Sequence, residues 1–164
     1  MIMKKWILSM TFLAMSGFAF AQKQVTIKGG TIVPVEAVKN VRATEVQVGQ
    51  NVDFRVTRDI IVDGTVAIPT GTIVKGNVYE TKRSTAFGTK GRLGISLRYL
   101  NLPSGDVVNF TSSNVYIQGK NRTALSVIVF ICTCLPFPCG SKAELKTGVE
   151  YDATVANNTT VTIE

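Results

Sequence analysis

Three cysteines lie close together in the sequence, at Cys132, Cys134 and Cys139. In an exported protein this grouping favours a disulfide. Cys132 and Cys134 would share one face of a strand, so Cys139 could close back onto either of them. The odd number leaves one thiol free or paired between chains. A metal site would lack its fourth ligand, a redox site would lack the Cys-x-x-Cys spacing, and simple buried thiols are the other alternative.

The sequence contains no histidine and eleven acidic residues. The missing histidine excludes Ser-His-Asp and Cys-His nucleophiles, histidine-bound zinc and the usual general base near neutral pH. No two of the acids form a recognisable acid/base motif. We therefore expect no catalytic residues, no cofactor and no metal. A carboxylate-based cell-wall hydrolase is the enzymatic alternative, and it would need two acids about 5–10 Å apart in a cleft.

A polar loop over residues 80–91 and its flank form a basic segment. One interpretation is a surface for anionic polymers or lipid headgroups, and the other is a solvated hairpin loop. Nucleic-acid binding would need aromatic stacking partners on the same face, and only Phe87 offers itself, so we do not expect nucleic acid. The anion-facing residues would be Lys82, Arg83, Lys90 and Arg92.

Residues 124–139 are the most hydrophobic part of the chain after its first segment. This stretch is too short, and too interrupted by Pro136 and Pro138, to span a membrane as a helix. It is either a buried strand over 125–131 followed by a proline turn, or an exposed apolar loop that contacts a membrane or a partner. In the second case the contact residues would be Phe130, Leu135 and Phe137.

Short runs rich in Val, Ile, Thr, Tyr and Phe alternate with Gly, Asn, Asp and Pro, and helical periodicity is nearly absent. This pattern predicts an all-β domain, a single small barrel or barrel-like sandwich. The rest of the chain is organised around residues 59–79, which we interpret as strands over 59–62, 65–68 and 72–79. Asp63-Gly64 and Pro69-Thr70-Gly71 are the turns between them.

A repeated unit supports this fold class. Glycine is followed by Val or Tyr three residues later and by Val or Ala seven residues later, in four places. Each glycine is expected to supply a positive φ at the turn that enters a strand. Chance similarity among turn–strand units is the alternative. Including the hairpin glycine, the predicted structural turns are Gly30, Gly49, Gly64, Gly71 and Gly148.

Alternation within the predicted strands identifies the inward-facing side chains. Val52, Phe54 and Val56 should point inward in the second copy, and Val74, Gly76 and Val78 in the third. The clearest single strand spans residues 92–102, where Leu93, Ile95, Leu97 and Tyr99 should share one face.

The first segment has the features of a secretory signal peptide. Lys4 and Lys5 precede an apolar stretch, and Ala19-Phe20-Ala21 has the small-residue spacing of a cleavage site. The apolar stretch is too short for a transmembrane helix. We expect residues 1–21 to be the signal peptide and residues 22–164 to form one domain.

Three motifs follow one another along the chain: Ile68-Pro-Thr-Gly-Thr, Gly91-Arg-Leu-Gly-Ile-Ser-Leu and Leu102-Pro-Ser-Gly-Asp. In this order they resemble the β-barrel domain of the VirB10/TrbI family, whose members belong to type IV secretion and conjugation machines. The pattern also resembles short exported envelope proteins with Gly-Thr-x-Val-Pro-Val near the start. The family's inner-membrane helix, proline-rich linker and helical antenna are missing from the sequence.

The resemblance implies a non-catalytic β-barrel in the bacterial cell envelope, with a structural or protein-interaction role. The expected partner is another envelope protein or a second copy of this chain, and a membrane surface is a further candidate. The expected location is periplasmic, outer-membrane-associated or secreted. A glycan- or lipid-binding module that uses the barrel mouth is the alternative function.

Overall fold

The computed structural model describes residues 23–85, 89–111, 113–120 and 141–163, and these contain strands but no helix. The expected signal peptide, Phe87, the hydrophobic stretch and the three cysteines lie outside the described residues. The cysteine and apolar-loop predictions therefore stay predictions. The strands are β1 (Lys23–Ile27), β2 (Ile32–Ala37), β3 (Val41–Arg42), β4 (Asn51–Val56), β5 (Ile60–Val62), β6 (Thr65–Ile68), β7 (Ile73–Lys82), β8 (Arg92–Asn101), β9 (Val107–Thr111), β10 (Asn114–Gln118), β11 (Glu144–Leu145), β12 (Glu150–Val155) and β13 (Thr159–Ile163).

The predicted all-β barrel is confirmed. One sheet has the strand order β10-β8-β7-β4-β2-β12-β9, and an additional antiparallel pairing of β8 with β9 closes six of these strands into a ring. β10 lies outside the ring and pairs with β8. Closure gives each strand of the ring two hydrogen-bonded neighbours, which removes open sheet edges from the barrel.

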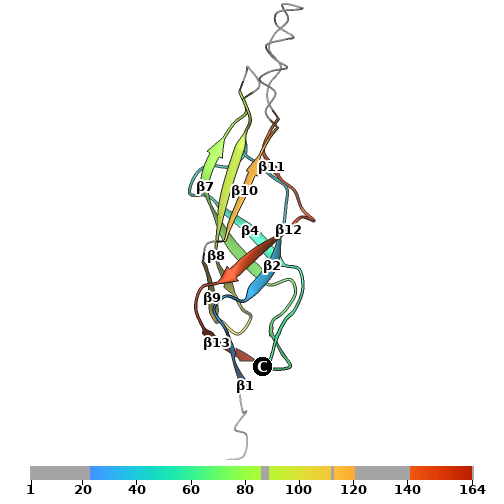
Figure 1. The fold of residues 1–164 in the computed structure, drawn as a ribbon, viewed down its shortest axis with the longest axis vertical. Helices are drawn as coiled ribbons and strands as arrows, with labels where there is room; N and C mark the ends of the chain where they lie inside the picture. Colours follow the sequence, from blue (N-terminus) through green and yellow to red (C-terminus); the bar gives the residue numbers. More distant parts are fainter. Residues whose placement is uncertain (1–22, 86–88, 112, 121–140, 164) are drawn as a thin grey trace, which may run out of the picture.

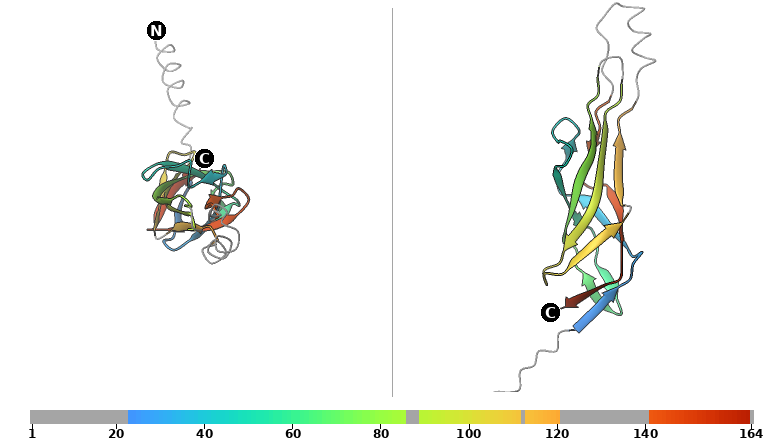
Figure 2. Two further views of the ribbon diagram at one scale, coloured as in Figure 1. Left: turned by 90° about the horizontal axis from the view of Figure 1, so that it is seen from above. Right: turned by 90° about the vertical axis from the view of Figure 1, so that its left-hand side faces the viewer.

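The molecule is elongated along the barrel (Figure 1). The β7–β8 hairpin, β10 and β11 extend to its upper end, whereas β1, β13 and the C-terminus lie at its lower end. Figure 2 shows the strands surrounding a central interior when the molecule is viewed from above. Three small antiparallel sheets complete the fold, formed by β1 with β13, β3 with β11, and β5 with β6.

The repeated glycine units correspond to four consecutive strands of the barrel. β7, β4, β2 and β12 are neighbours in the sheet, and each begins two residues after the repeat glycine. All four glycines have φ between 79° and 89°. Gly105 also has a φ of 89° and precedes β9 by two residues, so it opens a similar unit beside β12 that the sequence comparison missed.

The interior contains mainly aliphatic side chains, together with the aromatic rings of Phe54 and Phe110. Val52, Val74, Leu93 and Ile95 are each at most 2% exposed, and Phe54 is fully buried. The Phe54 ring packs edge-on against Tyr151, with ring centroids 6.5 Å apart. Gly76 leaves room for this packing, because a Cβ there would lie 3.0 Å from the Phe54 ring and 2.9 Å from Ile95. The barrel is therefore filled by its own side chains.

Two details of the sequence interpretation were wrong. Tyr99 does not share the inward face of Leu97. The register between β7 and β8 shifts between Lys75 and Gly76, which leaves Tyr99 37% exposed and places Leu100 in the core at 0% exposure. The unit over residues 59–79 is only in part the centre of the fold. Its third strand, β7, pairs with β4 and β8 in the barrel sheet, whereas β5 and β6 pair only with each other among the described strands.

Candidate functional site

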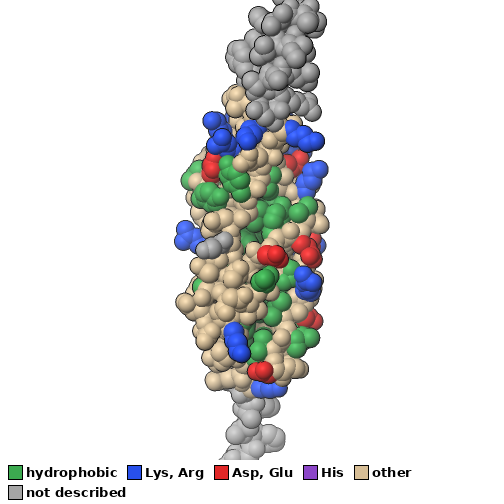
Figure 3. All heavy atoms as spheres, in the orientation of Figure 1, with side chains coloured by type: hydrophobic (Ala, Val, Ile, Leu, Met, Phe, Trp, Pro, Cys, Tyr) green, Lys and Arg blue, Asp and Glu red, His purple; other side chains and the backbone are tan. Residues whose placement is uncertain are grey.

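The basic residues predicted from the loop gather at the upper end of the molecule. Lys82 ends β7 and lies opposite Arg92, the first residue of β8. Arg92 forms a 3.7 Å ion pair with Glu80, and Arg83 donates a 3.3 Å hydrogen bond to the carbonyl oxygen of Thr44. Figure 3 shows Lys and Arg side chains concentrated at this end, with hydrophobic side chains exposed beside them on the side of β7.

The fourth basic residue, Lys90, donates a hydrogen bond to Oε1 of Gln118 on β10. This contact ties the β7–β8 hairpin to the edge strand. The structure therefore brings the four basic residues to one end of the barrel, and three of them make polar contacts there. Lys82 and Arg83 are exposed, and Lys90 and Arg92 are half-exposed.

Two exposed tyrosines lie next to this basic end and were missed in the sequence. Tyr79 on β7 and Tyr116 on β10 are 44% and 43% exposed. Gly94 on β8 lies between them, opposite Tyr116 in the register. The Tyr79 ring covers Gly94, since a Cβ there would lie 2.5 Å from the ring carbon that bears the hydroxyl. Desolvation raises the pKa of Tyr79, and Glu80 and Tyr116 add to this effect.

Alternation could have found this aromatic row. Tyr79 follows the inward-facing Val78, and Tyr116 follows the buried Val115, so both positions point outward. The pairing of β10 with β8, which brings Tyr116 next to Gly94 and the Tyr79 ring that covers it, is a long-range contact that no local pattern indicates.

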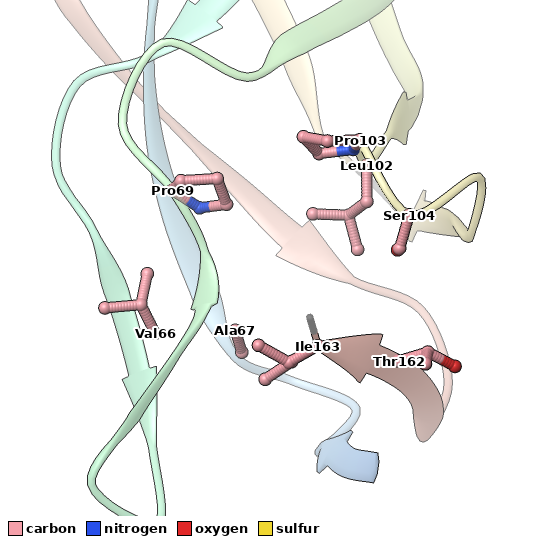
Figure 4. A pocket seen from close by; sticks show the side chains of 8 residues that line it. All are labelled: Val66, Ala67, Pro69, Leu102, Pro103, Ser104, Thr162 and Ile163. Carbon is pink, nitrogen blue, oxygen red and sulfur yellow. The ribbon is translucent and has the colours of Figure 1, made fainter. Parts of the chain in front are cut away.

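An apolar pocket of about 250 Å³ lies at the lower end of the molecule. Figure 4 shows Val66 and Pro69 on one wall, with Leu102 and Pro103 facing them from the turn that follows β8. Ile163 of β13 points into the space between these walls, near Ala67. The remaining lining residues are Ser104 and Thr162.

The polar groups around this pocket are held by Asp106. Its Oδ2 atom accepts a 2.7 Å hydrogen bond from the Thr162 amide and a 3.1 Å hydrogen bond from the Ser104 hydroxyl. The Thr162 side chain points away from the space between the two walls in Figure 4. The pocket therefore presents mainly hydrocarbon, and its volume lies below the range of about 300–1,000 Å³ that is typical of small-molecule sites.

Two glutamates share a second cavity, of about 400 Å³, which is lined by residues of β2, β4 and β12 and by the turn that precedes β7. Glu36 on β2 lies directly opposite Glu150 on β12. Like charges in this position destabilise a strand pair. Arg55 contacts Glu36 at 2.6 Å, and Arg58 lies 3.9 Å from Glu150. Each carboxylate is thus held in place by strand pairing, and a nearby arginine offsets its negative charge.

Charge is divided between the two sides of the ring. β7 and β8 carry four cationic side chains and one acidic one, whereas β2 and β12 carry three acidic side chains and no cationic one. β4 has one of each sign, and β9 has none. The barrel therefore has a basic side and an acidic side separated by strands without net charge.

Within the described ranges, no group of His, Cys, Asp and Glu side chains could hold a metal ion. The same part of the chain contains no helix that is long and apolar enough to cross a membrane.

No protein-family model matches the chain, and no curated protein matches it. Among solved structures, the chain is similar to ComB10 of the Com type IV secretion system of Helicobacter pylori. The two share 14% sequence identity with a TM-score of 0.43, and the match covers 82% of this chain and 88% of ComB10. The similarity is a distant structural resemblance.

Proposed function

We propose that this protein is an exported, non-catalytic module of the bacterial cell envelope that binds another protein through the apolar pocket at its lower end. The pocket is the observation that carries the proposal. Its volume of about 250 Å³ suits one bulky apolar side chain, and anchoring side chains that enter such pockets often dominate protein–protein affinity. The export part of the proposal is supported by the predicted signal peptide.

The construction of the pocket supports a docking role. Pro69 and Pro103 stiffen the two facing walls because their rings restrict the backbone. The turn that carries Pro103 is held by a 2.9 Å hydrogen bond from the Leu102 amide to the carbonyl oxygen of Asp106. A preformed pocket reduces the entropy that is lost when a partner binds.

The alternative of a glycan or lipid held in the barrel mouth has less support. The barrel interior is occupied by buried residues such as Phe54, Val74 and Ile95. The cell-wall hydrolase alternative has one pair of facing carboxylates, Glu36 and Glu150, and each of them already has an arginine partner. We retain the structural or interaction role as the proposed function.

A photocrosslinking amino acid placed at Val66 tests the proposal in the native cell. Val66 lines the pocket and is 39% exposed, so a bulky substitute can be accommodated there. We expect one defined crosslinked partner, identified by mass spectrometry. The matched control is the same amino acid at Val48, which is 63% exposed and does not line the pocket.

A second variant separates binding from folding. Val66→Glu places a charge at the rim of the pocket and should abolish co-purification of the partner without changing the unfolding midpoint. Equal crosslinking from both positions, or recovery of the protein only as a free monomer, would contradict the proposal.

A further inference from the structure

We propose that the outer face of β7, β8 and β10 binds an acidic polysaccharide, with sugar rings on the tyrosine row and the acidic groups on the neighbouring cations. This surface runs down the outer side of the barrel from Arg92 at its upper end to Tyr99. None of these residues lines the apolar pocket, so the inference does not depend on the function proposed for that pocket. We call this surface the tyrosine face, defined by Tyr79, Gly94, Tyr116, Arg92 and Tyr99.

The central feature of the tyrosine face is a pair of exposed aromatic side chains, Tyr79 and Tyr116. Because Gly94 has no side chain, the Tyr79 ring lies over the backbone of β8 and extends toward Tyr116. The two tyrosines are 44% and 43% exposed, although burial of each ring against a partner would be favourable. A sugar presents an apolar C–H face that fits such a ring, while its hydroxyl groups stay in water.

Cationic groups border the aromatic row on its upper side. Arg92 precedes Gly94 by two residues on the same face of β8, and Lys90 reaches Gln118, two residues beyond Tyr116. A guanidinium group can form paired hydrogen bonds with a carboxylate or phosphate. An acidic group attached to a sugar on the tyrosines would therefore meet a positive charge.

Hydrogen-bonding side chains border the row on its lower side. Asn77, Ser96 and Asn114 lie in register across β7, β8 and β10. Below them, Lys75 lies opposite the exposed Tyr99. From Arg92 to Tyr99 the face extends over roughly 23 Å, at about 3.3 Å per residue. The cationic, aromatic and amide or hydroxyl groups along this length are complementary to a linear polymer that carries acidic groups, apolar C–H faces and hydroxyl groups.

The number of available cations favours a polysaccharide over single-stranded nucleic acid. Nucleic acid carries a phosphate on every unit, and its binding sites use a dense basic track. On this face Lys75 is already paired with Asp53 at 2.7 Å, and Arg92 shares its charge with Glu80. The positive charge left on this face suits a polymer whose acidic groups are spaced more widely than the phosphates of nucleic acid. The predicted export of the chain points to the same class of ligand.

Titration of the purified protein with polygalacturonate tests the inference, with dextran as the uncharged polymer and oligothymidylate as the nucleic acid. We expect binding to polygalacturonate that weakens with added salt, and no binding to dextran. Tyr79→Ala should weaken binding by about fivefold, whereas Tyr79→Phe should retain it because the ring is kept. Arg92→Gln should also weaken binding.

Arg58→Gln is the matched control for the arginine, since Arg58 lies near Glu150 on the acidic side. It should leave the affinity unchanged. Equal losses in Arg58→Gln and Arg92→Gln would indicate unspecific charge attraction and overturn the inference. Tighter binding of oligothymidylate, unchanged affinity in Tyr79→Ala, or no binding of polygalacturonate would overturn it as well.

Discussion

The amide of Gly49 donates a 2.7 Å hydrogen bond to the carbonyl oxygen of Val78, and the amide of Val78 donates a 2.9 Å hydrogen bond to that of Gln50. Val78 stands seven residues after Gly71, the glycine of the neighbouring repeat. The reciprocal bonds at the other end of this strand pair link Gly71 and Thr72 to Val56, which stands seven residues after Gly49. The seven-residue spacing of the repeat is therefore the distance along one strand between its two sets of hydrogen bonds to the neighbouring repeat.

A Gly49→Ala substitution should destabilise the protein by about 1–2 kcal/mol, because the φ of 89° is costly for any residue with a Cβ. Nothing lies within 4 Å of the added carbon, so the loss would report backbone conformation rather than a clash. Equilibrium denaturation measures it. The neighbouring Val48→Ala is the control and should change stability by less than about 0.5 kcal/mol, since Val48 is exposed.

A Phe54→Ala substitution should cost about 3–5 kcal/mol of folding free energy, because it removes the largest fully buried side chain among the described residues and leaves a cavity beside Tyr151. The measurement is the free energy of unfolding in urea. Ile61→Ala, at a position that is 64% exposed, provides the comparison and should be nearly neutral. Similar losses for both variants would mean that the barrel interior is not the main core.

Gly119→Ala should loosen the upper end of the molecule. An added Cβ would lie 2.0 Å from the carbonyl oxygen of Ser141, so the backbone of one segment must move. The Gly119 amide bonds to the Gly91 carbonyl oxygen at 3.0 Å, and the Gly91 amide bonds to Ser141 at 3.1 Å. We expect a loss of about 1–3 kcal/mol.

Amide hydrogen exchange should localise this effect, with faster exchange at Gly91 and Gly119. Lys120→Ala is the adjacent control and should leave both rates unchanged. Uniform acceleration across all strands would instead indicate global destabilisation.

Asp59 should make stability depend on pH in the acid range. Its Oδ1 atom accepts hydrogen bonds from the Thr70 hydroxyl at 2.7 Å and the Thr70 amide at 2.6 Å, and both lower the pKa of Asp59 from its usual value of 3.8. A depressed pKa contributes stability that is present above 3.8 and is lost as the pH falls through the value in the folded state. Denaturation midpoints should therefore fall below about pH 4.

Asp59→Asn should flatten this acid dependence, because the amide side chain does not titrate. Thr70→Ser keeps the hydroxyl and the backbone amide, so it should preserve the dependence. An unchanged pH profile in Asp59→Asn would show that other carboxylates control acid unfolding.

Local patterns in the sequence were sufficient for the all-β class, the turns and most of the core. Alternation placed Val52, Phe54 and Val74 inside because successive side chains of a strand point to opposite faces. The same rule failed at Tyr99, where the irregular pairing of β7 with β8 reverses the faces and brings Leu100 inward. The shift depends on a partner strand, and the residues of β8 alone do not reveal it.

The sequence by itself determined the strand-forming segments and the glycines that start them, since both follow from preferences of neighbouring residues along the chain. Only the tertiary structure decided how the strands assemble. The closing pairing of Tyr99 with Asn109, the tyrosines brought together across Gly94, and the pocket between Pro69 and Pro103 all join separate segments. These contacts depend on which strands become neighbours, and that choice is made by packing of the whole core.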